Sequence, residues 1–218
     1  MKRKIVTIDG PAASGKGKIA KYISKKWKFK HLDSGLLYRR LAEILLKKNT
    51  NFNSINELRD KLERIELIST RKSIKLRSEL IGKIASKIAI YQFVREYINK
   101  IQRNLVNNKF KDNYFVIDGR DIGSVVFKGA DLKLYIDVTE ENRAKRRYKQ
   151  LIDSGEKSIY PKILKDIKLR DKKDKTRSNS PLLIPKGAII INNNGSFRNT
   201  TKQINTLIKK LNNDRSNR

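Results

Sequence analysis

A glycine-containing loop between an apolar run and an amphipathic segment is the feature that most limits the possible folds of this chain. Residues Lys4–Asp9 are mostly apolar, and glycines follow at positions 10 and 15 before a lysine at position 16. The spacing G-x-x-x-x-G-K, between an expected strand and an expected helix, is typical of a loop whose backbone N–H groups hold phosphate oxygens. The lysine can then reach terminal phosphates. A chance glycine turn is the weaker interpretation in this context.

The residues directly after the lysine depart from the common pattern. Many such loops carry a serine or threonine at the next position as a Mg²⁺ ligand, but this chain has Gly17 and then Lys18. We therefore expect the metal to be held by phosphates, water and Asp118. Lys18 would oppose the helix dipole, so we expect it to pair with bound phosphates. The residues expected to bind the nucleotide are Gly10, Pro11, Ala12, Ala13, Ser14, Gly15, Lys16, Gly17 and Lys18.

The remaining apolar runs predict a sheet. Buried strands are expected at Lys4–Asp9, Tyr114–Asp118, Leu132–Asp137 and Ala188–Ile191, with a brief fifth strand at Phe29–Leu32. Strands that alternate with helices predict an α/β fold with a doubly wound parallel sheet. The apolar faces of the helices are expected at Ile19, Ile23 and Trp27, at Ala144, Tyr148 and Leu151, and at Ile204, Leu207, Ile208 and Leu211.

Two stretches interrupt this alternation. Glu66–Leu76 alternates apolar and polar residues at its ends, which predicts a small inserted hairpin. Ser154–Pro185 is charged and contains one glycine and two prolines before its last residue, which predicts a mobile flap. We expect a single domain over residues 1–218, with an inserted segment at about 34–110 and a lid at about 155–185.

Composition limits the class of protein. Hydrophobic residues make up 38% of the 218 residues, which is enough for a core, and the lack of cysteine excludes disulfides and thiolate metal sites. Asp9 interrupts the first apolar run too early for a secretory signal, and no apolar run approaches the ~18 residues of a membrane helix. We expect a cytoplasmic, soluble protein that has no membrane partner.

The charge is strongly positive. Fifty-two basic and 22 acidic side chains give a formal net charge of +30. Nucleic-acid binding through phosphate neutralisation is one interpretation. Lysines are scattered over every segment, however, and aromatic residues do not interleave with them, so we favour compositional drift and expect no specific nucleic-acid partner.

Two short motifs follow expected strands. In Asp33–Arg39, Ser34 is a candidate helix cap, and Tyr38 and Arg39 one turn later could meet a sugar and a phosphate. Simple capping is the alternative. The motif Asp118–Asp121 lies at the carboxyl end of a strand, where ligands of such sheets bind.

The second of these motifs has three polar side chains. Asp118 could hold the water shell of Mg²⁺, Arg120 suits a phosphate, and Asp121 suits an exocyclic amine or an arginine. A strand-end turn with a surface ion pair is the alternative. His31, the single histidine, is expected to be structural.

Arginines are also grouped at helical spacing. Arg143, Arg146 and Arg147 share one face, and a similar spacing recurs in the predicted flap at Arg170, Asp174 and Arg177. Such runs are usually solvated faces. Beside a phosphate-binding loop, they also suit a closing lid that neutralises a transferring phosphoryl group.

The ordered set of motifs matches a known family. The chain contains, in this order, IDGPAASGKGK, HLDSGLLYR, IDGRDIGSVVF, RAKRRYKQL and RDKKDKTRSNSPL. Together they resemble bacterial cytidylate kinases, which are P-loop nucleoside monophosphate kinases, and the similarity runs from about Ile5 to the last helix. The pair DSGLLYR and DGRDIG separates this family from adenylate kinases. The inserted hairpin is shorter here than in the family.

The resemblance implies phosphoryl transfer from ATP to CMP or dCMP with Mg²⁺, by a protein that we expect to be a monomer. Roles in the chemical step are expected for Lys16, Arg120, Arg143, Arg147 and Arg177. The family's substrate-binding residues correspond here to Ser34, Tyr38, Arg39, Ser86, Arg95, Arg120, Asp121, Arg170, Asp174 and Arg177.

Within that set, the resemblance implies three tasks. Ser34, Tyr38 and Arg39 would form the monophosphate pocket together with Arg120. The cytosine base would be read by Ser86, Arg95 and Asp121, and the sugar and phosphates would contact Arg170, Asp174 and Arg177. Two rivals remain: a P-loop kinase of another small acceptor, and a basic nucleic-acid-binding protein.

Overall fold

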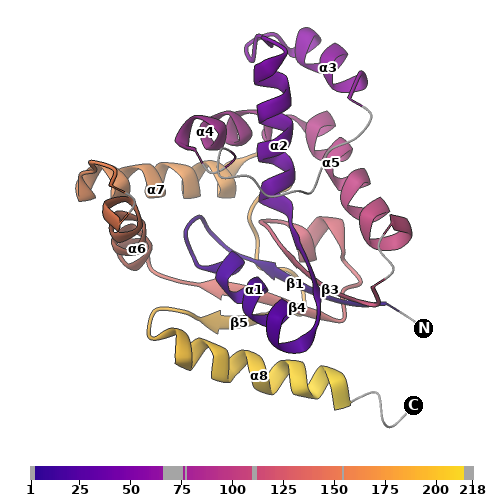
Figure 1. Cartoon of the computed structure of the whole chain (residues 1–218), viewed down its shortest axis with the longest axis vertical. Coiled ribbons are helices and arrows are strands. Elements are labelled where there is room, and N and C mark those ends of the chain that lie inside the picture. The colour runs from indigo at the N-terminus through magenta and orange to yellow at the C-terminus, as the bar shows by residue number, and fades with distance from the viewer. Residues whose placement is uncertain (1–2, 66–75, 77, 110–111, 154, 214–218) are drawn as a thin grey trace. The chain divides into compact units, whose positions relative to one another are not determined.

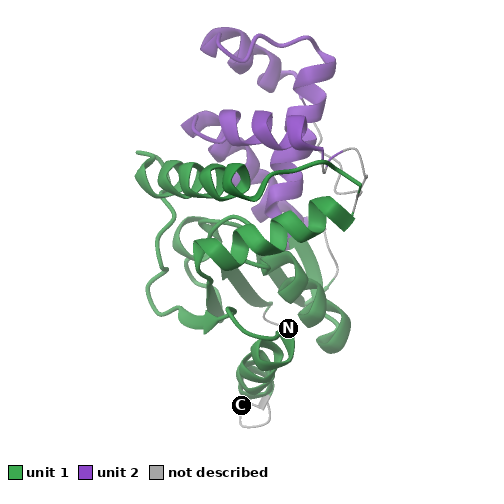
Figure 2. Ribbon diagram, turned by 90° about the vertical axis from the view of Figure 1, so that its left-hand side faces the viewer, with its two compact units in different colours: residues 1–32, 112–218 green, residues 33–111 purple. Residues whose placement is uncertain are grey.

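The computed structural model of the chain describes residues 3–65, 76, 78–109, 112–153 and 155–213 (Figure 1). It divides into two compact units, of which the first comprises Met1–Leu32 and Asp112–Arg218 and the second comprises Asp33–Lys111 (Figure 2). The predicted phosphate-binding loop and the strands and helices next to it belong to the first unit.

The described residues form a five-stranded sheet with the order β2-β3-β1-β4-β5. The strands are β1 (Lys4–Asp9), β2 (Lys30–Asp33), β3 (Tyr114–Asp118), β4 (Leu132–Asp137) and β5 (Ile189–Asn192). β1 pairs in parallel with β3 and β4, and β4 pairs in parallel with β5. The predicted α/β fold with a parallel sheet is therefore confirmed. Because β1 is central, its carboxyl end lies between those of β3 and β4.

The predicted strand boundaries agree closely with the observed ones. β1, β3 and β4 match their predictions, whereas the predictions for β2 and β5 begin and end one residue too early. In the described part of the chain, β2 and β5 are the edge strands, and each has four residues. Ile189 and Ile190 of β5 are 41% and 53% exposed.

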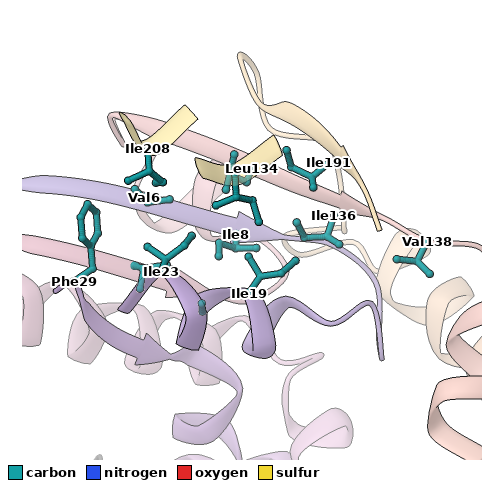
Figure 3. Packing of buried hydrophobic residues seen from close by; sticks show 13 residues of the cluster. Val6, Ile8, Ile19, Ile23, Phe29, Leu134, Ile136, Val138, Ile191 and Ile208 are labelled. Carbon is teal, nitrogen blue, oxygen red and sulfur yellow. The ribbon is translucent and has the colours of Figure 1, made fainter. Parts of the chain in front are cut away.

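The helices of the first unit are α1 (Lys16–Trp27), α6 (Glu140–Asp153), α7 (Tyr160–Thr176) and α8 (Phe197–Asn213), and a π-helical turn, η3, spans Ile122–Val126. Two of these helices, α1 and α8, pack their apolar faces on this sheet, and α6 and α7 pack on each other. Figure 3 shows Ile19 and Ile23 of α1 turned toward Ile8 of β1 in the main core. Trp27 is only partly buried against that core, as are Leu207 and Leu211 of α8. The predicted apolar faces of α1 and α8 therefore build the core that holds the loop before α1.

The segment predicted to be a flap contains a 17-residue helix, α7. Pro161 lies in its first turn, where proline needs no N–H partner and favours a helix start. Ile163 and Ile167 lie one turn apart and pack against Ala144 of α6. The helix was overlooked because this stripe is narrow and most of the surrounding residues are charged. The expected mobility of the segment stays a prediction.

The second unit is helical in its described residues. Its helices are α2 (Ser34–Lys47), α3 (Ile55–Glu63), α4 (Glu79–Ile88) and α5 (Gln92–Asn104), and α5 is followed by a π-helical turn, η2 (Leu105–Lys109). Leu41, Leu58 and Ile98 are fully buried in this unit. The predicted hairpin Glu66–Leu76 lies outside the described residues, except for Leu76. In neither unit does a described helix have the length and apolar character needed to cross a membrane.

Candidate active site

The loop between β1 and α1 has the backbone of a phosphate-binding loop. Gly10 has φ 148°, and a β-carbon there would lie 2.7 Å from the carbonyl oxygen of Ile136, so only glycine fits without a shift. Gly15 (φ 90°) is the N-cap of α1. Since glycine has no side chain to occupy the first N–H groups of the helix, those groups can face an anion.

Lys16 is buried inside the loop. Its ammonium donates hydrogen bonds to the carbonyl oxygens of Gly10 (2.8 Å) and Pro11 (2.6 Å) and to Ser14 Oγ (3.2 Å). Burial lowers the pKa of Lys16 below its ordinary value, and the positive charge of Arg120 adds to this effect. The lysine is therefore held within the loop and next to a second cation.

Two side chains from distant elements hold the carbonyl groups on either side of Ala13. Arg143 Nη1 donates to the carbonyl of Ala12 (3.1 Å), and Asn193 Nδ2 donates to the carbonyl of Ser14 (2.8 Å). Ala13 itself has φ 57°, in the left-handed region that residues with a β-carbon rarely adopt. The shape of the loop thus depends on contacts from α6 and from the residue after β5.

Asp9, at the end of β1, fixes the loop that follows β3. Its two carboxylate oxygens accept hydrogen bonds from the N–H groups of Ile122 (2.8 Å) and Gly123 (2.7 Å). Burial raises the pKa of Asp9 to about 6, despite these two hydrogen bonds, which act in the opposite direction. Asp121, directly before η3, is 4% exposed and is positioned by this anchoring.

Asp118 forms a close pair with His31. His31 Nε2 lies 2.6 Å from Asp118 Oδ1, and the two side chains are 6% and 10% exposed. Because the carboxylate accepts, the histidine donates through Nε2. The other oxygen, Oδ2, lies 3.7 Å from where a β-carbon on Gly17 would be, so it faces the start of α1. The prediction that His31 is structural overlooked this partner, which is 87 residues away.

This arrangement fits a water-mediated Mg²⁺ site. Asp118 presents a carboxylate oxygen beside the loop, as such a site requires. Among the residues that the structure describes, no group of three or more His, Cys, Asp or Glu side chains could hold a metal ion. That Asp118 holds the metal together with phosphates and water stays a prediction.

Arginines of the first unit gather around Asp174 of α7. Arg120 Nε lies 3.0 Å from Asp174 Oδ2, and Arg177 Nη1 lies 3.6 Å from Oδ1. Burial raises the pKa of Asp174, but the positive charges of Arg120, Arg170 and Arg177 outweigh it and hold the pKa below its ordinary value. Arginine side chains held around one carboxylate in this way suit the binding of a phosphate.

The other predicted arginines differ in their surroundings. Arg143 is 2% exposed, so it does not belong to a solvated face. Arg146 Nη2 donates to the carbonyl of Asn193 (2.6 Å), and burial lowers the pKa of Arg146. Arg147 Nη1 donates to Gln150 Oε1 (3.2 Å). Catalytic roles for Arg143 and Arg147 stay predictions.

Lys18 has an aromatic neighbour. Its ammonium lies 4.1 Å from the centroid of the Phe197 ring at the start of α8, and its side chain is exposed. This is a cation–π contact, which stabilises a charge that the α1 dipole disfavours. Sequence reasoning did not foresee this partner, and the expected pairing of Lys18 with phosphates stays a prediction.

The second unit contains the other predicted substrate residues, and its α2 begins differently from expectation. Asp33, not Ser34, is the N-cap of α2: its side chain accepts from the N–H of Leu36 (3.0 Å). Asp33 has the extended backbone of a cap, whereas Ser34 is already the first helical residue. The prediction of Ser34 as the cap was therefore wrong by one position.

Tyr38, Arg39 and Arg95 lie within this unit on α2 and α5. Arg39 Nη1 donates to the carbonyl of Leu76 (2.8 Å), and Arg95 lies 5.8 Å from the centroid of the Tyr38 ring. Ser86 is exposed on α4. The structure thus brings Tyr38 and Arg95 together.

Comparisons with known proteins agree with the family resemblance of the sequence motifs. The family model described as cytidylate kinase matches residues 6–213. The cytidylate kinase of Fusobacterium nucleatum is 39% identical over 187 residues, 82% of this chain and 84% of the relative. That of Rickettsia akari is 41% identical over 192 residues, 85% and 82% of the two chains, and that of Bartonella bacilliformis is 40% identical over 178 residues, 82% and 81%.

Solved structures support the fold alone. A Thermus thermophilus protein, TT1252, is similar with a TM-score of 0.56 and 14% identity over 97% of this chain and 99% of its own. An uncharacterized protein from Eubacterium ventriosum has a TM-score of 0.54 and 16% identity at the same coverage.

Proposed function

Because this chain belongs to the cytidylate kinase family, it is a kinase that transfers a phosphoryl group to CMP, and we propose that ATP with Mg²⁺ is the donor and dCMP a second acceptor. The observation that carries the proposal is the loop before α1. Its carbonyl groups are engaged by Lys16, Arg143 and Asn193, which leaves N–H groups of the loop and of the first turn of α1 for phosphate oxygens.

Positioning and charge are the means of catalysis in this proposal. Lys16 exchanges its carbonyl partners for oxygens of the donor's terminal phosphates, and Arg120 and Arg177 compensate the charge that the phosphoryl group spreads in the transition state. Mg²⁺, when bound, screens the phosphates, and Asp118 would hold one of its waters. Phosphoryl transfer of this kind needs little covalent chemistry from the protein.

The family resemblance assigns residues to the acceptor. Ser34, Tyr38 and Arg39 bind the monophosphate with Arg120, while Ser86, Arg95 and Asp121 read the edge of the base. Arg170 and Asp174 of α7 and Arg177, directly after it, contact the sugar and phosphates, in a lid at about 155–185. Residues at about 34–110 are the inserted monophosphate-binding segment of a single kinase domain. The burial of Arg95 and Asp121 supports their role in recognising the base. A base other than cytosine would leave hydrogen-bonding groups of these buried side chains unmatched.

We further propose that the protein acts as a monomer in the cytoplasm and has no specific nucleic-acid partner. The basic residues occur in every segment of the sequence, which supports a compositional origin for the charge.

An assay of ADP release across the nucleoside monophosphates tests the proposal. CMP and dCMP should be far better acceptors than AMP or GMP, and UMP, which differs at one edge of the base, should be the nearest competitor. ADP release without added acceptor measures the competing hydrolysis. Equal turnover of AMP and CMP would contradict the assigned specificity.

A further inference from the structure

Arg143 connects the phosphate-binding loop to α7. Its Nη1 donates to the carbonyl of Ala12 (3.1 Å), and its Nη2 lies 2.5 Å from Asp171 Oδ2 on α7. Its Nε donates to the carbonyl of Val138, directly after β4 (3.1 Å). Arg143 and Asp171 are 2% and 3% exposed. One buried guanidinium therefore joins three elements: the loop, the end of β4, and the helix that carries Arg170 and Asp174.

The contact with Ala12 controls the direction of an N–H group. A trans peptide is planar, so its C=O and N–H point in opposite directions. When Arg143 holds the carbonyl of Ala12 toward the protein, the N–H of Ala13 is turned away from Arg143. Asn193 acts in the same way on the carbonyl of Ser14 and so directs the N–H of Gly15.

The residue between these two contacts needs such support. Ala13 has φ 57°, and its β-carbon disfavours this conformation, which persists only where the surroundings enforce it. Asn193 is itself held, because its Oδ1 accepts from Thr200 Oγ1 (2.7 Å). Arg143 is held by the carboxylate of Asp171, whose planar geometry matches the guanidinium.

We propose that Arg143, held by Asp171, is a positioning residue that keeps the phosphate-binding loop in its donor-binding conformation, with Asn193 holding the other side of Ala13. The inference rests on the proposed function, since it concerns how the same loop binds its donor. In this proposal α7 acts on the loop through the Asp171 carboxylate, which fixes the Arg143 guanidinium.

Two substitutions test separately the charge and the shape of the Arg143–Asp171 pair. Arg143→Lys keeps a cation opposite Asp171 but lacks the planar fork that reaches Ala12 and Val138 at the same time. Asp171→Asn keeps the shape of the side chain and removes its charge. Titration calorimetry with ATP in the absence of CMP should show an increase in Kd of about tenfold for both variants.

The second readout is whether the variants weaken binding of the donor, ATP, without weakening binding of the acceptor, CMP. The KM for CMP should stay within about twofold of the native value, because neither side chain is assigned to the acceptor. Asp171→Asn should also lower Tm, since it leaves a buried guanidinium without its counterion, whereas Arg143→Lys should lower Tm less.

Ile167→Ala is the matched control. It removes apolar packing between α6 and α7 but leaves in place Arg143 and the three groups that Arg143 is shown to bind, on Ala12, Val138 and Asp171. It should lower Tm and leave the Kd for ATP within about twofold of the native value. An equal loss of ATP affinity in Ile167→Ala would show that any loosening of α7 has this effect and would overturn the inference.

Normal ATP affinity in a folded Arg143→Lys variant would overturn it as well. If that variant fails to fold, the ATP Kd of Asp171→Asn decides in the same way. The native protein gives the separate test of the proposed function: if it binds ATP but does not phosphorylate CMP, the acceptor assignment fails while the loop inference still stands or falls on the variants.

Discussion

Replacement of Asp9 by asparagine should change how the stability of the protein depends on pH. The Asp9 carboxylate is fully buried at the end of the central strand and accepts hydrogen bonds from the N–H groups of Ile122 and Gly123. Asparagine occupies the same space but does not titrate. It offers one acceptor where the carboxylate offers two, so Asp9→Asn should cost some stability at every pH, and the informative quantity is the slope.

The magnitude follows from the pKa of Asp9, which burial raises from its ordinary value of 3.8 to about 6. At about 1.4 kcal/mol per unit, this corresponds to about 3 kcal/mol. The folded state binds the proton more tightly than the unfolded chain does. The contribution of Asp9 to stability is therefore fully present below pH 3.8 and is lost as the pH rises through about 6.

Urea unfolding followed by circular dichroism, from about pH 4 to about pH 8, measures this contribution. The free energy of unfolding of the native protein minus that of Asp9→Asn should fall by about 2–3 kcal/mol over this range. Groups that do not interact with Asp9, such as Asp174 with its lowered pKa, titrate alike in both proteins and cancel. A difference that stays flat or rises with pH would show that the hydrogen bonds from Ile122 and Gly123 outweigh burial, and would refute the reasoning.

Three further substitutions test the loop and its surroundings. Lys16→Ala should lower kcat by about two orders of magnitude, because one preorganised charge is lost at the transition state; near-native turnover would contradict the assignment of the donor site. Gly123→Ala should destabilise the fold by about 1–3 kcal/mol in thermal unfolding. Its new β-carbon would lie 2.7 Å from Thr7 Oγ1. An unchanged Tm would show that the neighbouring side chains move to accommodate the β-carbon. Lys18→Thr should change kcat less than about tenfold and, if anything, weaken ATP binding, measured as kcat and KM for ATP at saturating CMP; an inactive native protein rescued by threonine would show a degenerate loop.

The strands were predictable because each is a short apolar run. β1, β3 and β4 each end at an aspartate, which marks the boundary clearly, and their predicted limits match. α7 was not predicted, because Ile163 and Ile167 form a narrow stripe in a charged segment, and its packing against Ala144 depends on residues that are distant in sequence. Local patterns therefore sufficed for the sheet but not for helices with little buried surface.

The candidate site shows the same division. The loop with Lys16 could be found from spacing alone, because its residues are contiguous. The role of Asp9 as an anchor of Gly123 could not, because the two are 114 positions apart. Nor could the spacing of Arg143 show that its guanidinium turns inward to Ala12, which depends on a contact across 131 positions.

The short edge strands bear on how copies of this protein behave at high concentration. In the described part of the chain, β2 and β5 each offer only four residues along which a foreign strand could pair. β5 would otherwise be a hazard, because Ile189 and Ile190 are exposed and apolar. A short edge gives an incoming strand few hydrogen bonds to offset the conformational entropy that the strand loses on pairing. The net charge of +30 adds mutual repulsion between copies, so brevity and charge together oppose the growth of intermolecular sheets.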